Sequence, residues 1–371
     1  MRNVHIYPSN FSHESRILKE ATTLAASLDF QQVDLVGVKD VNLPATQVIS
    51  DRVIIHRLGP TKGRGMMKAV RHLLWCLNVT WFCLTRGYGV VNCHSLPVLP
   101  IGAFVRLITP AKLVYDTHEL ETETAGSSPR RRRIGRLVER ICIRFVSLII
   151  VVSPGIEKWD RQQYGVERII TVLNAPRYRN AISTTRTLLG DPSAKVVLYQ
   201  GVLAKGRGIE HLVEASELIK DAGYSLVFLG YGAMEQELRD LARTRPFHVL
   251  PAVPPEDLWE YTAAAHIGVC LIEDICLSYH LSLPNKLFEY GMARIPVVAS
   301  DMPEIRYLVE KWQIGACIAA WDAASILRAI QQAEAIRDGA FVERAESLAQ
   351  TVSWERQEEV LCNGYRSFVL T

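Results

Sequence analysis

Short apolar runs alternate with longer stretches of helical periodicity along almost the whole chain. In the first half, the apolar runs predict strands at Val4–Tyr7, Gln32–Val38, Val53–Arg57, Val90–His94, Lys112–Asp116, Leu148–Ser153 and Ile169–Leu173. Helical spacing lies between these runs, as in Glu14–Leu28. An alternation of this kind indicates a parallel sheet that carries helices on both faces.

The same pattern restarts in the second half. There we expect strands at Lys195–Tyr199, Ser225–Leu229, His248–Leu250, Ile267–Cys270 and Val297–Ala299, and helices at Ile209–Ala222, Ala233–Arg243, Pro255–Ala264, Lys286–Ala293 and Met302–Lys311. The polar stretch Arg177–Ser193 has no clear periodicity and predicts a linker. We therefore place one Rossmann-like domain over residues 1–178, a linker over 179–193, a second Rossmann-like domain over 194–352 and a final helix over 353–371.

Charge divides the chain at nearly the same point. Residues 1–180 carry 25 Lys and Arg against 14 Asp and Glu, a net charge of +11, and the rest carries 17 against 25, a net charge of −8. A chain of 371 residues with 49% hydrophobic and 22% charged residues is an ordinary globular protein of about two domains. The basic half suggests an anionic partner for that half alone.

The eight cysteines stand singly in apolar stretches, without a CxxC pair, so we expect a reduced, cytoplasmic compartment. The N-terminal residues contain no apolar run of signal-peptide length. Since no run has the length of a membrane span, any membrane contact is expected to be peripheral.

The segment LPNKLFEYGMA, residues 283–293, combines several features of a ligand site. Pro284 and Asn285 open a predicted helix, whose free N–H groups favour an anion, and Lys286 adds a full positive charge. Glu289 follows three residues later on the same face, where a carboxylate suits vicinal hydroxyls. The simpler alternative is a surface helix with one ion pair.

Two glycine-bearing turns follow predicted strands in the same half. The first contains Gly201, Lys205 and Arg207, and the second contains Gly230 and Gly232. Glycine lets the backbone approach a ligand closely, and the two cations can neutralise a diphosphate. The second turn lacks the third glycine of a dinucleotide fingerprint, and the chain has no Walker A sequence, which disfavours dehydrogenases and P-loop ATPases.

Together these stretches resemble a known family. YQGVLAKGRGIEHLVEA, LVFLGYGAMEQEL, LSLPNKLFEYGMARIPVVASDMPEI and SWERQEEVL are similar to the retaining glycosyltransferases of family 4, in a branch with an LPNK-x-x-EY donor motif. FSHESRILKEA, VYDTHEL and VVSPGIEKW match more loosely. The resemblance implies an α/β GT-B fold, in which two Rossmann-like parallel-sheet domains face each other across a cleft and the C-terminal helix crosses back towards the N-terminal domain.

The resemblance also implies roles for individual residues. In the donor domain, Glu289 would hold the ribose hydroxyls, Arg207 and Lys286 the diphosphate, and the loop with Ala252 and Val253 the nucleobase. Gly201, Lys205, Gly230, Gly232, Pro284 and Asn285 would complete the donor site. In the N-terminal domain, His118 would lie beside the transferred sugar, and Phe11, Glu14, Arg16 and Glu119 on the acceptor side.

Two positions depart from the family pattern. Leu281 stands where many members have a second glutamate, and Val202 where many have an arginine. Glu273 or Asp274 could replace the missing carboxylate if their loop folds over the sugar. With Glu273 chosen, the predicted catalytic set is His118, Glu273 and Lys286. The acidic run after His118 is more typical of an exposed loop than of a cation site, and the sequence contains no Asp-x-Asp motif, so we expect no metal and no other cofactor.

The most basic segment begins at Pro129. Arg130, Arg131, Arg132, Arg133 and Arg136 accompany an apolar stripe at helical spacing, which predicts an amphipathic helix at an anionic membrane surface. The segment Lys62–Arg71, followed by HLLWCL, is a second candidate. The alternative is that both stripes face the core. Nucleic acid is not expected, because no aromatic residues interleave with the arginines.

The resemblance thus implies a metal-independent retaining glycosyltransferase in bacterial surface polysaccharide or glycoconjugate synthesis. It would use a nucleoside-diphosphate sugar and a glycan or polyprenyl-linked glycan acceptor, at the inner face of the plasma membrane. Two alternatives stay open: a non-catalytic sugar-nucleotide-binding scaffold subunit, and a sugar-nucleotide 2-epimerase of the same fold.

Overall fold

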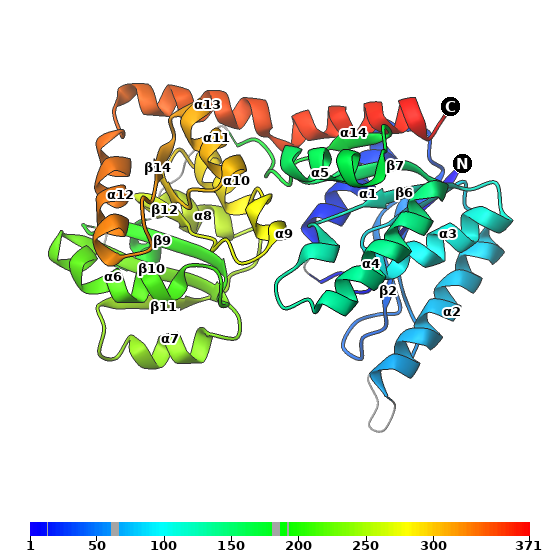
Figure 1. Cartoon of the computed structure of the whole chain (residues 1–371), viewed down its shortest axis with the longest axis horizontal. Coiled ribbons are helices and arrows are strands. Elements are labelled where there is room, and N and C mark those ends of the chain that lie inside the picture. Colours follow the sequence, from blue (N-terminus) through cyan, green and yellow to red (C-terminus); the bar gives the residue numbers. More distant parts are fainter. Residues whose placement is uncertain (13, 61–66, 180–185, 191–192) are drawn as a thin grey trace. The chain divides into compact units, whose positions relative to one another are not determined.

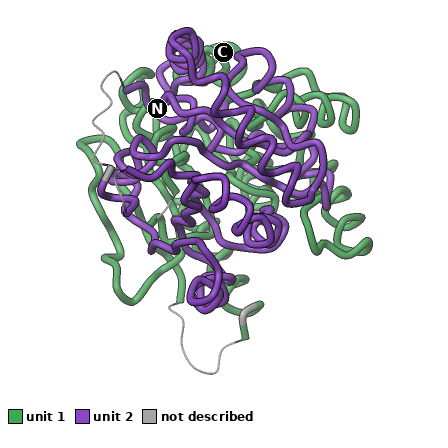
Figure 2. Tube along the Cα trace, turned by 90° about the vertical axis from the view of Figure 1, so that its left-hand side faces the viewer, with its two compact units in different colours: residues 1–172, 358–371 green, residues 173–357 purple. Residues whose placement is uncertain are grey.

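The computed structural model describes the chain except for residues 13, 61–66, 180–185 and 191–192. The chain forms two compact units: residues 1–172 with 358–371 (unit 1), and residues 173–357 (unit 2) (Figure 2). Each unit is built on one sheet covered by helices (Figure 1). The predicted pair of parallel-sheet domains is therefore confirmed.

Unit 1 contains an eight-stranded sheet in the order β3-β4-β2-β1-β5-β6-β7-β8. Its strands are β1 (Arg2–Ile6), β2 (Gln32–Val38), β3 (Thr46–Ser50), β4 (Val53–Leu58), β5 (Val90–Cys93), β6 (Lys112–Asp116), β7 (Val146–Val151) and β8 (Ile169–Thr171). All pairs are parallel except β3 with β4. The central strands are buried along almost their whole length because helices cover the sheet on both sides.

The α-helices of unit 1 are α1 (Ser15–Ser27), α2 (Lys68–Arg86), α3 (Leu99–Ile108), α4 (Pro129–Cys142) and α5 (Pro154–Tyr164). Local sequence fixes several of their ends. Ser128 and Ser153 cap α4 and α5 through their hydroxyls, each followed by proline at the first helical position. Gly87 and Gly165 end α2 and α5 in the left-handed conformation.

Unit 2 contains a six-stranded parallel sheet in the order β11-β10-β9-β12-β13-β14. Its strands are β9 (Lys195–Val202), β10 (Tyr224–Tyr231), β11 (Phe247–Pro251), β12 (Ile267–Cys270), β13 (Val297–Ala299) and β14 (Gly315–Cys317). Its helices are α6 (Ile209–Asp221), α7 (Glu235–Leu241), α8 (Leu258–Ala264), α9 (Leu277–His280), α10 (Asn285–Met292), α11 (Pro303–Trp312), α12 (Ala323–Ala335) and α13 (Gly339–Val352).

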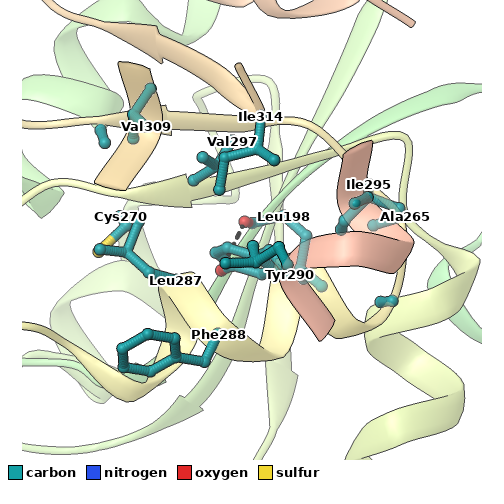
Figure 3. Close-up of a cluster of buried hydrophobic side chains, with 14 of the residues drawn as sticks. Leu198, Ala265, Cys270, Leu287, Phe288, Tyr290, Ile295, Val297, Val309 and Ile314 are labelled. Carbon is teal, nitrogen blue, oxygen red and sulfur yellow. Dashed lines mark hydrogen bonds between the residues drawn. The ribbon is translucent and has the colours of Figure 1, made fainter. Parts of the chain in front are cut away.

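Tyr290 fixes α10 against this sheet. Its ring is fully buried, and its hydroxyl donates towards the carbonyl of Leu198 at 3.1 Å (Figure 3). The N–H of Gln200 donates to the same hydroxyl at 3.2 Å. A side chain at Gly268 on β12 would meet the Tyr290 ring at 2.3 Å. Glycine on the strand and tyrosine on the helix therefore set how closely α10 approaches β9 and β12.

The last helix, α14 (Trp354–Phe368), belongs to both units by its contacts. Trp354 is fully buried in unit 2, where its N–H donates to the carbonyl of Pro176 at 2.9 Å. Tyr365 is buried in unit 1 and its hydroxyl bonds to Asn92. The chain thus enters unit 2 at Leu173, six residues before the expected start of the linker, and most of that expected linker (180–185 and 191–192) lies outside the described residues.

Within the described part of the chain, no helix combines the length and the hydropathy that a transmembrane segment requires.

Candidate active site

Lys286 is the most unusual charged residue of unit 2. It is the second residue of α10, directly after the cap at Pro284, and it is only 8% exposed. Its ammonium group has no hydrogen-bond partner among the residues that the structure describes, and it lies 3.8 Å from the centre of the Tyr199 ring. Burial, with a smaller contribution from the guanidinium of Arg207, lowers the pKa of Lys286 to about 8. A buried cation at a helix N-terminus is a feature that favours an anionic ligand.

Glu289 lies one helical turn after Lys286 and is held from β9. The amide of Gln200 donates to Oε2 of Glu289 at 2.6 Å, and its carbonyl oxygen accepts from the hydroxyl of Thr262 at 2.8 Å. Gln200 is itself buried. The sequence analysis missed Gln200, although a polar residue that ends an apolar strand just before Gly201 was a usable signal.

Glycine lines the carboxyl ends of β9 and β10. Gly201 has a φ of +119° and lies opposite Gly230, where a Cβ would come within 1.8 Å of the Gly201 carbonyl oxygen. At Gly232, φ is +153° and a Cβ would lie 2.3 Å from the Leu203 carbonyl oxygen. These positions exclude larger residues, so backbone alone forms this edge.

The loop after β9 carries the other two cations. Lys205 is exposed, and Arg207 is half-buried with its guanidinium 4.8 Å from the centre of the Tyr279 ring. Gly206 and Gly208, on either side of Arg207, both have positive φ. Arg207 therefore lies between two glycines, directly before the start of α6.

Glu273 holds this loop in place. Its N–H donates to the carbonyl of Gly206 at 3.1 Å, and its carboxylate accepts from the N–H of Gly208 at 3.3 Å. The structure thus brings Glu273 to the loop that carries Arg207 and gives its carboxylate a positioning contact; its predicted catalytic role stays a prediction.

The remaining donor-side residues are less enclosed. Asn285 and Ala252 are exposed, and Val253, just beyond β11, is half-buried against the unit 2 core. Leu281 ends the short helix α9. All of these positions lie near the carboxyl ends of parallel strands, where ligands bind in open α/β sheets.

Unit 1 has a buried polar cluster at the ends of β1, β5 and β6. Nδ1 of His94 lies 2.9 Å from Asp116, and Nε2 of His94 lies 2.7 Å from Nδ1 of His5. Nε2 of His118 is 3.4 Å from the same Asp116 oxygen, and Arg16 donates to the other oxygen at 3.1 Å. His118 is the most exposed of these side chains, at 26%. The buried members of the cluster therefore orient the partly exposed imidazole of His118.

Charges inside this cluster balance each other. Burial by itself would raise the pKa of Asp116, but Arg16 and the hydrogen bonds from His118 and His94 bring it well below its usual value. Burial and the nearby Asp116 raise the pKa of Glu20 well above its usual value. Asp116 and Glu20 thus share the guanidinium of Arg16, whose Nε lies 3.0 Å from Oε1 of Glu20.

The predicted acceptor-side residues are not equally accessible. Arg16 is 4% exposed and binds Asp116, Glu20 and the carbonyl of Val172 inside unit 1. Phe11 is also 4% exposed and has a φ of +59°. Glu14 precedes α1, and Glu119 is exposed. Of the four, Glu119 is exposed to solvent, whereas Arg16 and Phe11 are buried in the interior of unit 1.

The acidic run after β6 is not the exposed loop that we expected. Glu123 is buried and accepts from Arg136 at 2.7 Å. Glu121 accepts from the N–H of Leu96 at 2.9 Å, and burial raises its pKa to about 8. Both carboxyls connect neighbouring segments of unit 1, which the spacing of the residues alone did not reveal.

Two groups in the described residues bring three potential metal ligands within 4.8 Å of one another: His5, Glu20 and His94, and His94, Asp116 and His118. Arg16 forms ion pairs with the carboxylate of each group. A fixed guanidinium therefore already supplies the positive charge beside both carboxyls, which opposes the binding of a second cation.

Comparisons with known proteins agree with this layout. Residues 194–335 match the family described as "Glycosyl transferases group 1". Chitobiosyldiphosphodolichol beta-mannosyltransferase of Kluyveromyces lactis is 25% identical over 168 residues, which cover 43% of this chain and 37% of the relative. The alignment therefore spans little more than a third of that curated relative.

Solved structures show the same fold over the full length. Sucrose-phosphate synthase of Thermosynechococcus elongatus superposes with a TM-score of 0.80 at 18% identity, covering 99% of both chains. HepE of Anabaena in complex with UDP-glucose superposes with a TM-score of 0.73 at 16% identity, covering 99% of this chain and 100% of the other. With its two parallel-sheet domains, the chain has the GT-B architecture.

Proposed function

We propose that the protein is a glycosyltransferase that uses a nucleoside-diphosphate sugar. The observation that carries this proposal is the buried, unpartnered ammonium of Lys286 at the start of α10, one turn before Glu289. A diphosphate suits the first group and ribose hydroxyls suit the second. The family match over residues 194–335, which contain both residues, supports this assignment.

Unit 2 would bind the donor without a metal. Lys286, Arg207 and the N-terminus of α10 would stabilise the charge that develops on the diphosphate as the bond from its oxygen to the sugar C1 breaks. The acceptor oxygen would bond to C1 on the same face, so that the anomeric configuration is retained, and its proton would pass to the departing diphosphate. His118, oriented by Asp116, would contact the transferred sugar.

The acceptor is proposed to be a glycan or a polyprenyl-linked glycan of bacterial surface polysaccharide or glycoconjugate synthesis, at the cytoplasmic face of the membrane. Two relatives support these classes. The Kluyveromyces lactis enzyme is named for a dolichol-linked substrate, and the Anabaena structure contains UDP-glucose.

Binding measurements with UDP, GDP and ADP test the donor site. We expect Glu289→Ala to weaken binding of the preferred nucleotide about 10- to 100-fold, because a carboxylate hydrogen bond to a hydroxyl contributes about 1.5–3 kcal/mol. Glu237→Ala on α7 is the matched control, because Glu237 is exposed and lies away from α10. Equal affinities for the two variants would refute the assignment.

Product analysis separates the proposed transferase from its alternatives. NMR of the donor with an acceptor panel, in the presence of EDTA, should show a new glycoside with the donor's anomeric configuration. Conversion of the donor without an acceptor would indicate an epimerase, and binding without turnover would indicate a scaffold subunit. The Kluyveromyces lactis relative is named for a beta linkage. A product with the inverted anomeric configuration would show that the reaction is not retaining, and would contradict that part of the proposal.

A further inference from the structure

Helices α2, α3 and α4 of unit 1 expose large apolar side chains in unusual number. Of the 24 exposed large hydrophobic residues among those the structure describes, 11 lie on these three helices: Val70, Leu73, Leu74, Leu77, Trp81, Phe104, Leu107, Ile108, Ile134, Leu137 and Ile141. The helices pack side by side, α2 on α3 and α3 on α4 (Figure 1). We call this surface the α2–α4 face.

The apolar positions form a stripe on each helix. On α2 they recur from Val70 to Trp81 at intervals of three and four residues, and Trp81 is 71% exposed. The opposite side of α2 is already buried, through Trp75, Val79 and Phe82. A helix that is apolar on both sides needs a second apolar neighbour, and the described part of the chain supplies only one.

Helix α4 shows the same stripe edged by arginine. Ile134, Leu137 and Ile141 lie on one side of the helix and are about half exposed. Arg130, Arg133 and Arg140 are exposed and, by helical spacing, fall on the same side, and Arg144 is exposed in the 3-10 turn Ile143–Phe145 that follows the helix. No described carboxylate forms an ion pair with these four arginines. The interpretation that this stripe faces the core is therefore wrong.

Acidic side chains are absent from the exposed part of this face. The described sequences of α2 and α3 contain no Asp or Glu, and Glu139 of α4 is 3% exposed and accepts from Tyr115 and Tyr164. Arg136 differs from the other arginines because Glu123 binds it. Residues 62–66 of the second basic segment lie outside the described residues.

We propose that the α2–α4 face docks on an anionic lipid bilayer and inserts its apolar side chains among the acyl chains. Aliphatic and tryptophan side chains with a border of arginine are what the interface of such a membrane binds. This inference rests on the proposed function at the membrane. To the electrostatic contact of α4 it adds the insertion of side chains from α2 and α3. Docking in this way would orient unit 1 towards a lipid-linked acceptor.

Co-sedimentation with vesicles tests the face directly. We expect the protein to bind phosphatidylcholine vesicles containing a quarter phosphatidylglycerol at least tenfold more tightly than pure phosphatidylcholine. Leu77→Asp, Leu107→Asp and Leu137→Asp, one on each helix, should each weaken binding about tenfold. Leu218→Asp on α6 of unit 2, where Leu218 is 41% exposed, is the matched control and should leave binding unchanged.

The arginine contribution has its own signature. Arg133→Gln combined with Arg140→Gln should weaken binding to the anionic vesicles about 25-fold, about fivefold for each arginine, and should make the remaining binding less sensitive to salt. Binding that is equal for anionic and neutral vesicles, or unchanged in this double variant, would overturn the electrostatic half of the proposal.

Fluorescence shows whether the side chains insert. Vesicles with brominated acyl chains should quench the tryptophan emission of the wild type, and Trp81→Phe should remove most of that quenching. If the aspartate variants instead disrupt a dimer of the free protein without affecting vesicle binding, the face binds a second copy and the proposal is wrong. Affinity for UDP should be the same in all these variants, so failure of membrane docking is distinguishable from failure of the donor site.

Discussion

At Lys286 a functional charge opposes the stability of the folded protein. Its pKa of about 8 lies below the ordinary value of 10.5, so the unfolded chain binds this proton more tightly than the folded chain does. The resulting loss of stability is complete below pH 8 and disappears as the pH rises towards 10.5. At about 1.4 kcal/mol per pH unit it amounts to about 3 kcal/mol.

Lys286→Met should therefore stabilise the protein while it abolishes diphosphate binding. We expect the free energy of unfolding, measured by urea denaturation at pH 7, to rise by about 2–3 kcal/mol, with a smaller gain at pH 10. Lys220→Met, at an exposed position at the end of α6, should change neither property. A less stable Lys286→Met variant at pH 7 would contradict this account of the site.

The same residue predicts the pH dependence of nucleotide binding. In the proposed donor site a diphosphate such as that of UDP would be bound by the charged form of Lys286, and that form is lost as the pH rises through about 8. Titration calorimetry should show the affinity for UDP falling about tenfold between pH 7.5 and pH 9. Lys286→Arg stays charged over this range, so its affinity should vary little with pH. A parallel decline in both proteins would assign the pH effect to another group.

At the scale of elements, the packing of α10 decides where Lys286 and Glu289 lie. Gly268→Ala on β12 would place a methyl group 2.3 Å from the ring of Tyr290, which is fully buried and cannot move aside. We expect a loss of about 1–3 kcal/mol in the free energy of unfolding, together with weaker UDP binding, because α10 must shift from the sheet. Gly339→Ala, where nothing lies within 4 Å of the new methyl group, should have neither effect.

The sequence predicted most elements because the strands other than β3 are parallel and largely buried, which gives mainly apolar runs. It missed β3 (Thr46–Ser50), whose residues are mainly exposed and pair only with β4 at the sheet edge. It also missed β14 (Gly315–Cys317), which is too short to show a pattern. Local periodicity identified the stripe on α4 but not its exposure, because exposure depends on what the rest of the chain packs there.

Side-chain partners were still less accessible to sequence reasoning. The motif around Glu289 was evident in the sequence. Gln200, however, lies 89 residues earlier, and its hydrogen bond to Glu289 forms only because α10 packs beside β9. The family resemblance assigned Arg16 to the acceptor side, yet Arg16 is buried against Asp116, which lies 100 residues later in the chain. Contacts of this range depend on the tertiary fold, which residue spacing does not encode.

At the scale of the whole molecule, charge and chain path separate two functions. The basic part of the chain contains the α2–α4 face, whereas the acidic part contains the proposed donor site, with a few cations at the ends of strands. The chain crosses between the units at Leu173 and again within α14, after Gln357. The two halves of one helix thus stabilise different units, and their effects should be separable.

Hydrogen exchange with mass spectrometry measures this separation. Tyr365→Ala should speed exchange in the strands of unit 1, because the buried ring packs on Phe30 and its hydroxyl bonds to Asn92. We expect the free energy of unfolding of unit 1 to fall by about 3–5 kcal/mol. Trp354→Ala should speed exchange in unit 2 instead. Addition of UDP should slow exchange in unit 2 and offset the Trp354→Ala effect, because a ligand stabilises the unit that binds it. Rescue of the Tyr365→Ala variant by UDP would show that the two units unfold as one, and would contradict the division of α14 between them.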